Sequence, residues 1–165
     1  MRKIAISFIF ISICCDKATA QDCYWQQWAN YSMAVKLDVS TNRLTGLQTL
    51  KYTNDSPDTL KKVFFHLYWN AFRPGSMMDM LSRQMMDQHN SIDLFKDKVA
   101  DRIGKLKADE IGYEKVSELT MDGVPQKWQT DETILEVFLT RPILPHTTVT
   151  FRDKFEAQVP LDILL

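Results

Sequence analysis

The sequence predicts a mainly β protein, an antiparallel β-sandwich with a short helical insertion at about residues 76–110, preceded by an N-terminal signal peptide. Three observations carry this prediction. Apolar and polar residues alternate with a period of two in several short segments, and clusters of turn-forming residues separate these segments. The 165-residue chain is also 45% hydrophobic, which suffices for one self-supporting core. Many short strands with short polar turns favour two packed antiparallel layers.

The first twenty residues have the three parts of a secretory signal. A basic start at residues 2–3 precedes an apolar core at 4–15, and the small residues Ala18 and Ala20 predict cleavage between Ala20 and Gln21. The core has about a dozen residues, against the roughly 20 that span a bilayer. We therefore expect a signal peptide at 1–20, a domain at 21–165, export to the periplasm or the cell exterior, and no stable membrane span after cleavage.

Lipid attachment at Cys14 or Cys15 is the alternative to simple cleavage. Lipoprotein processing favours small residues before the modified cysteine, whereas Ile13 precedes Cys14, and Cys14 itself precedes Cys15. Simple cleavage is therefore the favoured route.

Charge and cysteine content exclude some classes of function. The whole chain has a formal net charge of −1, with 20 basic and 21 acidic residues. Removal of residues 1–20 takes away three basic residues and one acidic residue, so the remainder is mildly acidic. Such a surface gives no electrostatic footprint for nucleic acid. Cys23 alone remains after cleavage, so no intrachain disulfide is expected.

The first three predicted strands follow in order. Residues 31–39 alternate strictly and predict a half-buried strand. The Ser40-Thr41-Asn42 turn joins it to a second strand at 44–53, and residues 54–58 form a second turn. Apolar and aromatic side chains fall on both faces of residues 60–69, LKKVFFHLYW, which predicts an inner strand covered on both sides.

A helical insertion interrupts the strands. Pro74-Gly75 breaks the third strand, and Ser76 with Asp79 is expected to cap a short helix. Ser91 is expected to cap a second helix, in which apolar residues at 92, 95, 99 and 103 recur at helical spacing before Gly104. The methionines of this region favour irregular packing over a binding surface; they are Met77, Met78, Met80, Met85 and Met86.

Four further strands complete the expected sandwich, at residues 112–119, 124–128, 134–139 and 147–157. Asp122-Gly123 is a strong two-residue hairpin signal between the first two of them. Pro125 limits the second to a sheet edge or a strand start. Arg141-Pro142 is expected to end the third.

No residue pattern predicts catalysis, metal binding or cofactor binding in this chain. The three histidines are far apart, and no HExxH motif is present. His66 is interpreted as a hydrogen-bonded core residue and His146 as a loop residue, and His89 lies in a loop between them. Cys23 lies in a loose terminus. The acidic pairs Asp109-Glu110 and Asp131-Glu132 are interpreted as solvent-exposed charged residues. The scattered glycines form no phosphate-binding loop.

The four tryptophans offer one alternative to a purely structural reading. Trp25, Trp28, Trp69 and Trp128 would suit a platform that stacks on sugars. The favoured interpretation places Trp69 in the core. In the same interpretation, Trp25 and Trp28 pack onto the sandwich or onto a neighbouring domain.

Three stretches carry a resemblance to a known family: FFHLYWNAFRPGS, IGKLKADEIGY and LPHTTVTFRDKFEAQVP. Across residues 24–160 the chain resembles the amino-terminal β domain of secreted bacterial zinc aminopeptidases, the aminopeptidase N-like gluzincins. The resemblance implies a parent enzyme that removes amino-terminal residues from peptides, with Zn in a following catalytic domain. It transfers no site residue to this chain, and it makes that catalytic domain the expected partner, with a peptide as the parent's substrate.

Two functions therefore remain open. The first is a non-catalytic domain of an exported zinc metalloaminopeptidase, truncated before its catalytic domain and inactive alone. The apolar ending at 159–165 favours this reading. The second is a complete secreted β-sandwich module that binds a carbohydrate or a protein partner.

Overall fold

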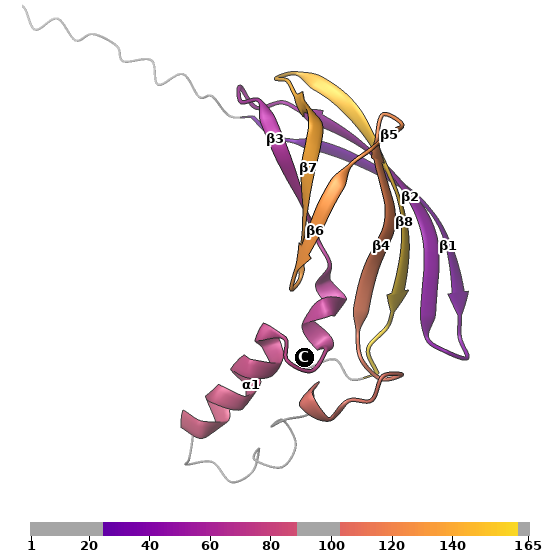
Figure 1. Ribbon diagram of the computed structural model, residues 1–165, viewed down its shortest axis with the longest axis vertical. Helices are drawn as coiled ribbons and strands as arrows, with labels where there is room; N and C mark the ends of the chain where they lie inside the picture. Colours follow the sequence, from indigo (N-terminus) through magenta and orange to yellow (C-terminus); the bar gives the residue numbers. More distant parts are fainter. Residues whose placement is uncertain (1–24, 89–102, 162–165) are drawn as a thin grey trace, which may run out of the picture.

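The computed structural model describes residues 25–88 and 103–161 and contains two antiparallel sheets (Figure 1). The larger sheet has the strand order β1-β2-β8-β4-β5 and the smaller sheet the order β3-β7-β6. The strands are β1 (Trp28–Asp38), β2 (Arg43–Asn54), β3 (Leu60–His66), β4 (Tyr113–Met121), β5 (Val124–Pro125), β6 (Lys127–Asp131), β7 (Ile134–Ile143) and β8 (Thr147–Gln158). The predicted mainly β, two-layer antiparallel architecture is confirmed.

The predicted helical insertion is present as α1 (Met77–Gln88), flanked by two short 3-10 helices, η1 (Tyr68–Phe72) and η2 (Ile103–Lys105). The predicted helix after Ser91 falls outside the described residues, apart from its last apolar position, Ile103, which begins η2. The signal segment, with Ala20 and Gln21, also lies outside them, as do Cys23 and His89.

The core lies between the two sheets, at the end where the smaller sheet covers the larger. Side chains of β2, β4 and β8 meet those of β7 there, and the ring of Phe65 on β3 packs edge-on against Phe151 on β8, with centroids 5.8 Å apart. The buried apolar residues of this cluster are Leu50, Leu67, Leu119, Met121, Leu135, Val137, Ile143, Val149 and Phe151. β8 is the central strand of the larger sheet, and its inner face supplies Val149 and Phe151 to the core before it continues through residues 153, 155 and 157.

The β1–β2 hairpin forms as predicted, but β1 is not half-buried. All eleven β1 residues pair with β2 in one unbroken register, and Asn42 adopts a positive φ of 55° in the turn. The Asp38 carboxylate accepts hydrogen bonds from the hydroxyl and the backbone N–H of Ser40, which lower its pKa. Both faces of β1 are nevertheless exposed, because the smaller sheet does not extend over this edge of the larger one.

The aromatic run at 60–69 is an edge strand and a 3-10 helix, so the prediction of an inner strand is wrong. β3 ends at His66 and pairs with β7 alone among the described residues, while Tyr68 begins η1. Only one face of β3 packs on the core. Phe64 points away from the core and is 61% exposed. Aromatic side chains lie on both faces of β3, but only one face is covered by another layer.

One buried glutamine marks the point where the chain passes from the larger sheet to the smaller. Residues 124–128 are split between β5 and β6, and Pro125 lies at the sheet edge as predicted. Between them, Gln126 donates from its amide to Val124 O (2.7 Å) and Thr140 Oγ1 (3.1 Å). Its side-chain oxygen accepts the Thr140 N–H at 2.9 Å. These bonds satisfy both ends of the amide and tie the crossover to β7, which runs on through the expected stop at Pro142.

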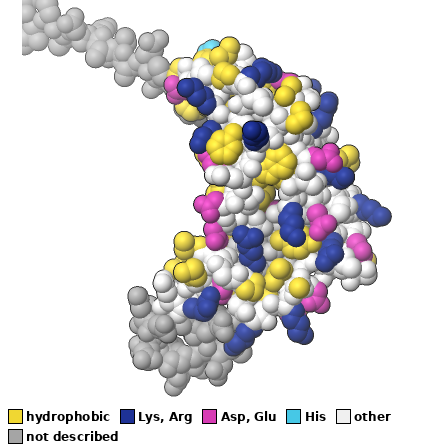
Figure 2. All heavy atoms as spheres, viewed as in Figure 1, with side chains coloured by type: hydrophobic (Ala, Val, Ile, Leu, Met, Phe, Trp, Pro, Cys, Tyr) yellow, Lys and Arg dark blue, Asp and Glu magenta, His cyan; other side chains and the backbone are white. Residues whose placement is uncertain are grey.

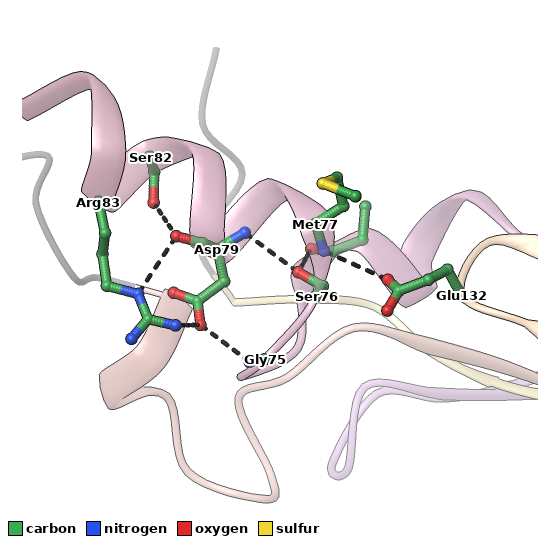
Figure 3. Close-up of polar contacts among 8 residues, drawn as sticks. Gly75, Ser76, Met77, Asp79, Ser82, Arg83 and Glu132 are labelled. Carbon is green, nitrogen blue, oxygen red and sulfur yellow. Dashed lines mark hydrogen bonds and ion pairs between the residues drawn. The ribbon is translucent and has the colours of Figure 1, made fainter.

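The start of α1 is capped as the sequence predicts (Figure 3). Ser76 Oγ accepts the Asp79 N–H at 3.2 Å, and Asp79 is itself buried. Its carboxylate accepts the Gly75 N–H (2.8 Å) and pairs with Arg83 one turn further on (2.6 Å). Met77, Met78 and Met80, however, have exposed side chains, so the expected packing role is wrong for these three methionines.

Replacement of Gln126 tests the crossover. We expect Gln126→Ala to lower the free energy of unfolding by about 1–3 kcal/mol, because it leaves the Thr140 N–H without its partner in a buried site. Gln129→Ala is the matched control, since the amide of Gln129 bonds to Glu136 on an exposed face, and its effect should stay within about 0.5 kcal/mol. Urea denaturation of both variants measures the difference, and equal losses would contradict a special role for Gln126.

Candidate functional site: an apolar groove on the larger sheet

The larger sheet extends beyond the smaller one, and its inner face continues there as a groove. Figure 2 shows the molecule hollowed between the smaller sheet and the segment that contains α1. The groove has a volume of about 290 Å³. Its walls come from β1, β2, β3, β4, β7, β8 and η1: Met33, Val35, Leu44, Gln48, Phe65, His66, Leu67, Trp69, Glu114, Lys115, Val116, Leu119, Leu135, Asp153, Phe155 and Ala157.

A glycine in β2 shapes the floor of the groove. Gly46 lies opposite Phe155 on β8 and opposite Val35 on β1. A Cβ on Gly46 would stand 2.6 Å from the Phe155 ring and 3.0 Å from Ala34 O. An isolated glycine inside a strand often marks such a close approach. The absence of a side chain at position 46 therefore lets the Phe155 ring lie against the sheet.

A polar pair interrupts this apolar floor. Asp153 on β8 lies directly opposite Gln48 on β2, and the Gln48 amide donates to Asp153 Oδ1 at 3.0 Å. Asp153 is only 8% exposed. Burial raises the pKa of its carboxyl from 3.8 to about 6, and the hydrogen bond from Gln48 opposes this shift. The groove thus contains a carboxyl group that titrates near neutral pH.

A second carboxylate lies at the end of the groove nearest η1. Burial raises the pKa of Glu114 on β4, while hydrogen bonds from the backbone of Trp69 and Tyr68 act in the opposite direction. The Glu114 backbone N–H donates to the side chain of Asn70 (2.8 Å), whose amide donates to Glu132 O (3.1 Å). Asn70 therefore connects η1 to β4 and to the β6–β7 turn, and it holds Trp69 in the groove wall.

His66 lies at the rim of the groove, and the interpretation as a core histidine is wrong. Its side chain is exposed, and its ring stacks on Tyr68 with centroids 5.1 Å apart and an angle of 13° between the planes. The chain leaves β3 at His66, so the ring has no covering layer. The stack instead links the end of β3 to η1.

The other candidates from the sequence lie outside the groove. His146 is a turn residue, as predicted, with a φ of 56° and its N–H bonded to Asn54 O. Glu110 accepts the Lys107 N–H, and Glu132 accepts the Met77 N–H. Among residues 25–88 and 103–161, no group of three His, Cys, Asp or Glu side chains is arranged to hold a metal ion.

The tryptophans are dispersed. Trp128 packs against the core as a partly buried residue, Trp69 is half-buried in the groove wall, and Trp25 and Trp28 are exposed. The expected placement of Trp69 is thus confirmed only in part. Trp25 and Trp28 are not docked onto the sandwich.

Asp153 and Glu114 were not predicted from the sequence as residues of a functional site. The signal for Asp153 was present, because residues 149, 151, 153, 155 and 157 share one face of β8. A charged residue within an otherwise apolar face marks either a strand end or a polar contact across the sheet.

No helix among the described residues is long and apolar enough to cross a membrane.

Comparisons with known proteins give similarity at the level of structure only. No family model matches the sequence, and no curated protein matches it. The fold is similar to the M1 zinc metallopeptidase from Deinococcus radiodurans, with a TM-score of 0.45 and 16% identity over 78% of this chain and 19% of that one. A two-domain M1 zinc metallopeptidase variant bound to L-arginine gives a TM-score of 0.47 and 16% identity over 81% and 21%. The chain thus spans about a fifth of these structures.

Asp153 gives the stability of the protein a testable pH dependence. Because its pKa is higher in the folded chain than in the unfolded chain, the folded state binds the proton more tightly, and stability falls as the pH rises from about 4 to about 6. Asp153→Asn should remove this fall and raise the free energy of unfolding at pH 7 by on the order of 1–3 kcal/mol. Thermal or urea unfolding between pH 3.5 and pH 8, roughly the range that brackets both pKa values, measures it.

Asp38→Asn provides a control of opposite sign. The Asp38 carboxyl has a lowered pKa, so it contributes stability above its ordinary pKa, and this contribution is lost as the pH falls through the folded value. The variant should therefore be less stable than the parent at pH 7. If Asp153→Asn also lost stability at pH 7, the buried carboxylate would not be the destabilising group described here.

Proposed function

We propose that this chain is the non-catalytic β domain of an exported zinc aminopeptidase, and that the apolar groove is the surface on which the neighbouring catalytic domain rests. The three stretches that carry the family resemblance support the proposal, because they build the relevant parts of the fold. FFHLYWNAFRPGS forms the end of β3, η1 and the approach to α1. LPHTTVTFRDKFEAQVP contains the whole of β8, the central strand of the larger sheet.

The observation that carries the proposal is the part of the inner face of the larger sheet, at β1 and the groove beside it, that the smaller sheet leaves open. Met33 and Val35 lie on the same apolar face as the half-buried Phe155, yet they are 54% and 50% exposed and line an open groove. Large apolar patches on soluble proteins usually mark surfaces that contact a partner. A domain in the same polypeptide meets this need without the entropy cost of bringing two separate molecules together.

In this proposal the chain contributes a wall and not the chemistry. The catalytic domain of the parent would hold Zn and the peptide, and this domain would bury apolar surface against it and close one side of the substrate cavity. Residues 1–20 would direct the enzyme out of the cytoplasm, with cleavage between Ala20 and Gln21. No catalytic or metal-binding role is assigned to any residue of this chain.

A complete secreted binding module is the second candidate. The exposed rings of Trp25 and Trp28 favour it, since a sugar ligand stacks on such side chains. The gene sequence downstream of the Leu165 codon distinguishes the two candidates. A continuation that encodes HExxH supports the aminopeptidase domain, and an immediate stop codon supports the binding module.

The purified chain tests the proposal directly. We expect no release of product from alanyl or leucyl chromogenic amides and no stoichiometric zinc by metal analysis, because the proposal places the chemistry in another domain. Turnover by this chain, or one zinc ion per chain, would contradict it.

The groove should also bind an apolar fluorescent dye. Val116→Lys places a charge in the groove wall and should reduce the dye signal severalfold, whereas Val124→Lys, at an exposed position on β5 outside the groove, should leave it unchanged. A dye-silent parent chain, or equal effects of the two lysines, would count against a groove that needs a neighbouring domain.

A further inference from the structure

The two sheets have four edge strands among the described residues, and three of them are poor templates for another strand. β5 has two residues and contains Pro125, which lacks a backbone donor. β6 has five residues. β3 has a register irregularity between Leu60 and Lys62, with exposed lysines at 61 and 62. Short edges, prolines, lysines and irregularities are the devices that prevent strands from pairing between molecules.

The fourth edge, β1, lacks these devices over most of its length. It lies at the outer edge of the larger sheet (Figure 1). It has eleven residues with no proline or glycine, and every residue pairs with β2 in one register. Its two charged residues, Lys36 and Asp38, lie near one end. Alternate backbone N–H and C=O groups of such a strand point away from β2 and are open to a further strand.

β1 is also held in place before any partner arrives. The Gln27 amide donates to Asn54 Oδ1 at 3.1 Å, and its oxygen accepts the Asp55 N–H at 3.0 Å. These bonds fix the start of β1 to the end of β2, and the turn at residues 39–42 fixes the other end. A preformed edge loses less conformational entropy on binding than a mobile one.

The side chains of β1 define the strand that would fit beside it. Tyr31, Met33, Val35 and Leu37 share the inner face and are each between 50% and 54% exposed. The opposite face carries Trp28 at its start, followed by the mainly polar series Asn30, Ser32, Ala34, Lys36 and Asp38. A strand that continues the sheet must therefore present apolar residues on one face and polar residues on the other, at the same spacing.

β1 meets this requirement itself when a second copy runs antiparallel to it. The register that pairs all eleven residues is centred on Met33. It places Tyr31 opposite Val35 of the second copy, and Ala29 opposite Leu37. On the other face Lys36 lies opposite Asn30, and Asp38 lies opposite Trp28, so no like charges meet across the pair. Apolar faces of both copies then lie on the same side of one continuous sheet.

We propose that two copies of this chain associate through β1, edge to edge and antiparallel, with Met33 at the two-fold axis. The two five-stranded sheets become one ten-stranded sheet, and the exposed inner-face residues of β1 pack against their counterparts. The proposal does not depend on the aminopeptidase assignment, because it rests on the open backbone edge of β1, although Met33 and Val35 also line the groove.

The first test of association varies the protein concentration and introduces a charge at the proposed interface. An interface of one strand is smaller than the usual 800 Å² or so per partner, so we expect a dimer to appear between about 1 µM and about 1 mM in sedimentation equilibrium. Val35→Lys should weaken it at least tenfold, because it places a lysine in the pairing face. Leu47→Lys is the control, since Leu47 is 59% exposed on the opposite face of the neighbouring strand, and it should leave the association unchanged.

A cysteine scan tests the register. In a chain with Cys14, Cys15 and Cys23 replaced by serine, single cysteines at positions 31, 33 and 35 are oxidised mildly, and intermolecular disulfide formation is followed on a gel. The rate should be highest for Met33→Cys, because only position 33 faces its own copy. A monomer throughout the concentration range, a dimer that tolerates Val35→Lys, or a maximum away from position 33 would overturn the proposal.

Discussion

The packing of β8 against the smaller sheet is the interaction on which the rest of the structure depends. Val149 and Phe151 supply the part of β8 that meets β7 and β3, and the same face continues through Asp153, Phe155 and Ala157, which line the groove. Asp153 and Ala157 are buried there, and Phe155 is half-buried. A strand cannot change the face on which its alternate residues lie without a bulge. One central strand therefore supplies both the closed core at one end and the floor of the groove at the other.

The difference in size between the two sheets follows from the crossover at Gln126. The chain adds only two residues, β5, to the larger sheet before it turns into β6, and the smaller sheet has three strands among the described residues. Three strands about 4.8 Å apart cannot cover the four long strands β1, β2, β8 and β4 of the larger sheet. The exposure of β1 and the open groove thus have one geometric cause, which is the small size of the sheet that faces the larger one. The hydrogen bonds of the Gln126 side chain hold the crossover in place.

Local pattern predicted the strands well and their surroundings poorly. The alternation in β1, the turn at Asn42 and the hairpin at Asp122-Gly123 each depend on nearby residues, and all three formed as expected. The half-buried state of β1 and the inner position of β3 depend on which strands lie beside and above them, and alternation does not encode that information. Asp153 shows the same limit, because its raised pKa arises from burial in the sheet and not from its neighbours in sequence.

Asp153 also constrains what can cover the groove. In the open groove its carboxyl is already partly desolvated and holds its proton to about pH 6. A partner that excluded the remaining water with apolar groups alone would disfavour the charged form further, and Asp153 would then bind as the neutral acid. A partner that brings a hydrogen-bond donor or a cation to Asp153 would lower the pKa instead and gain a charge-assisted bond. Any apolar surface that fits Phe155 must therefore include a polar group placed over Asp153, or bind more tightly as the pH falls.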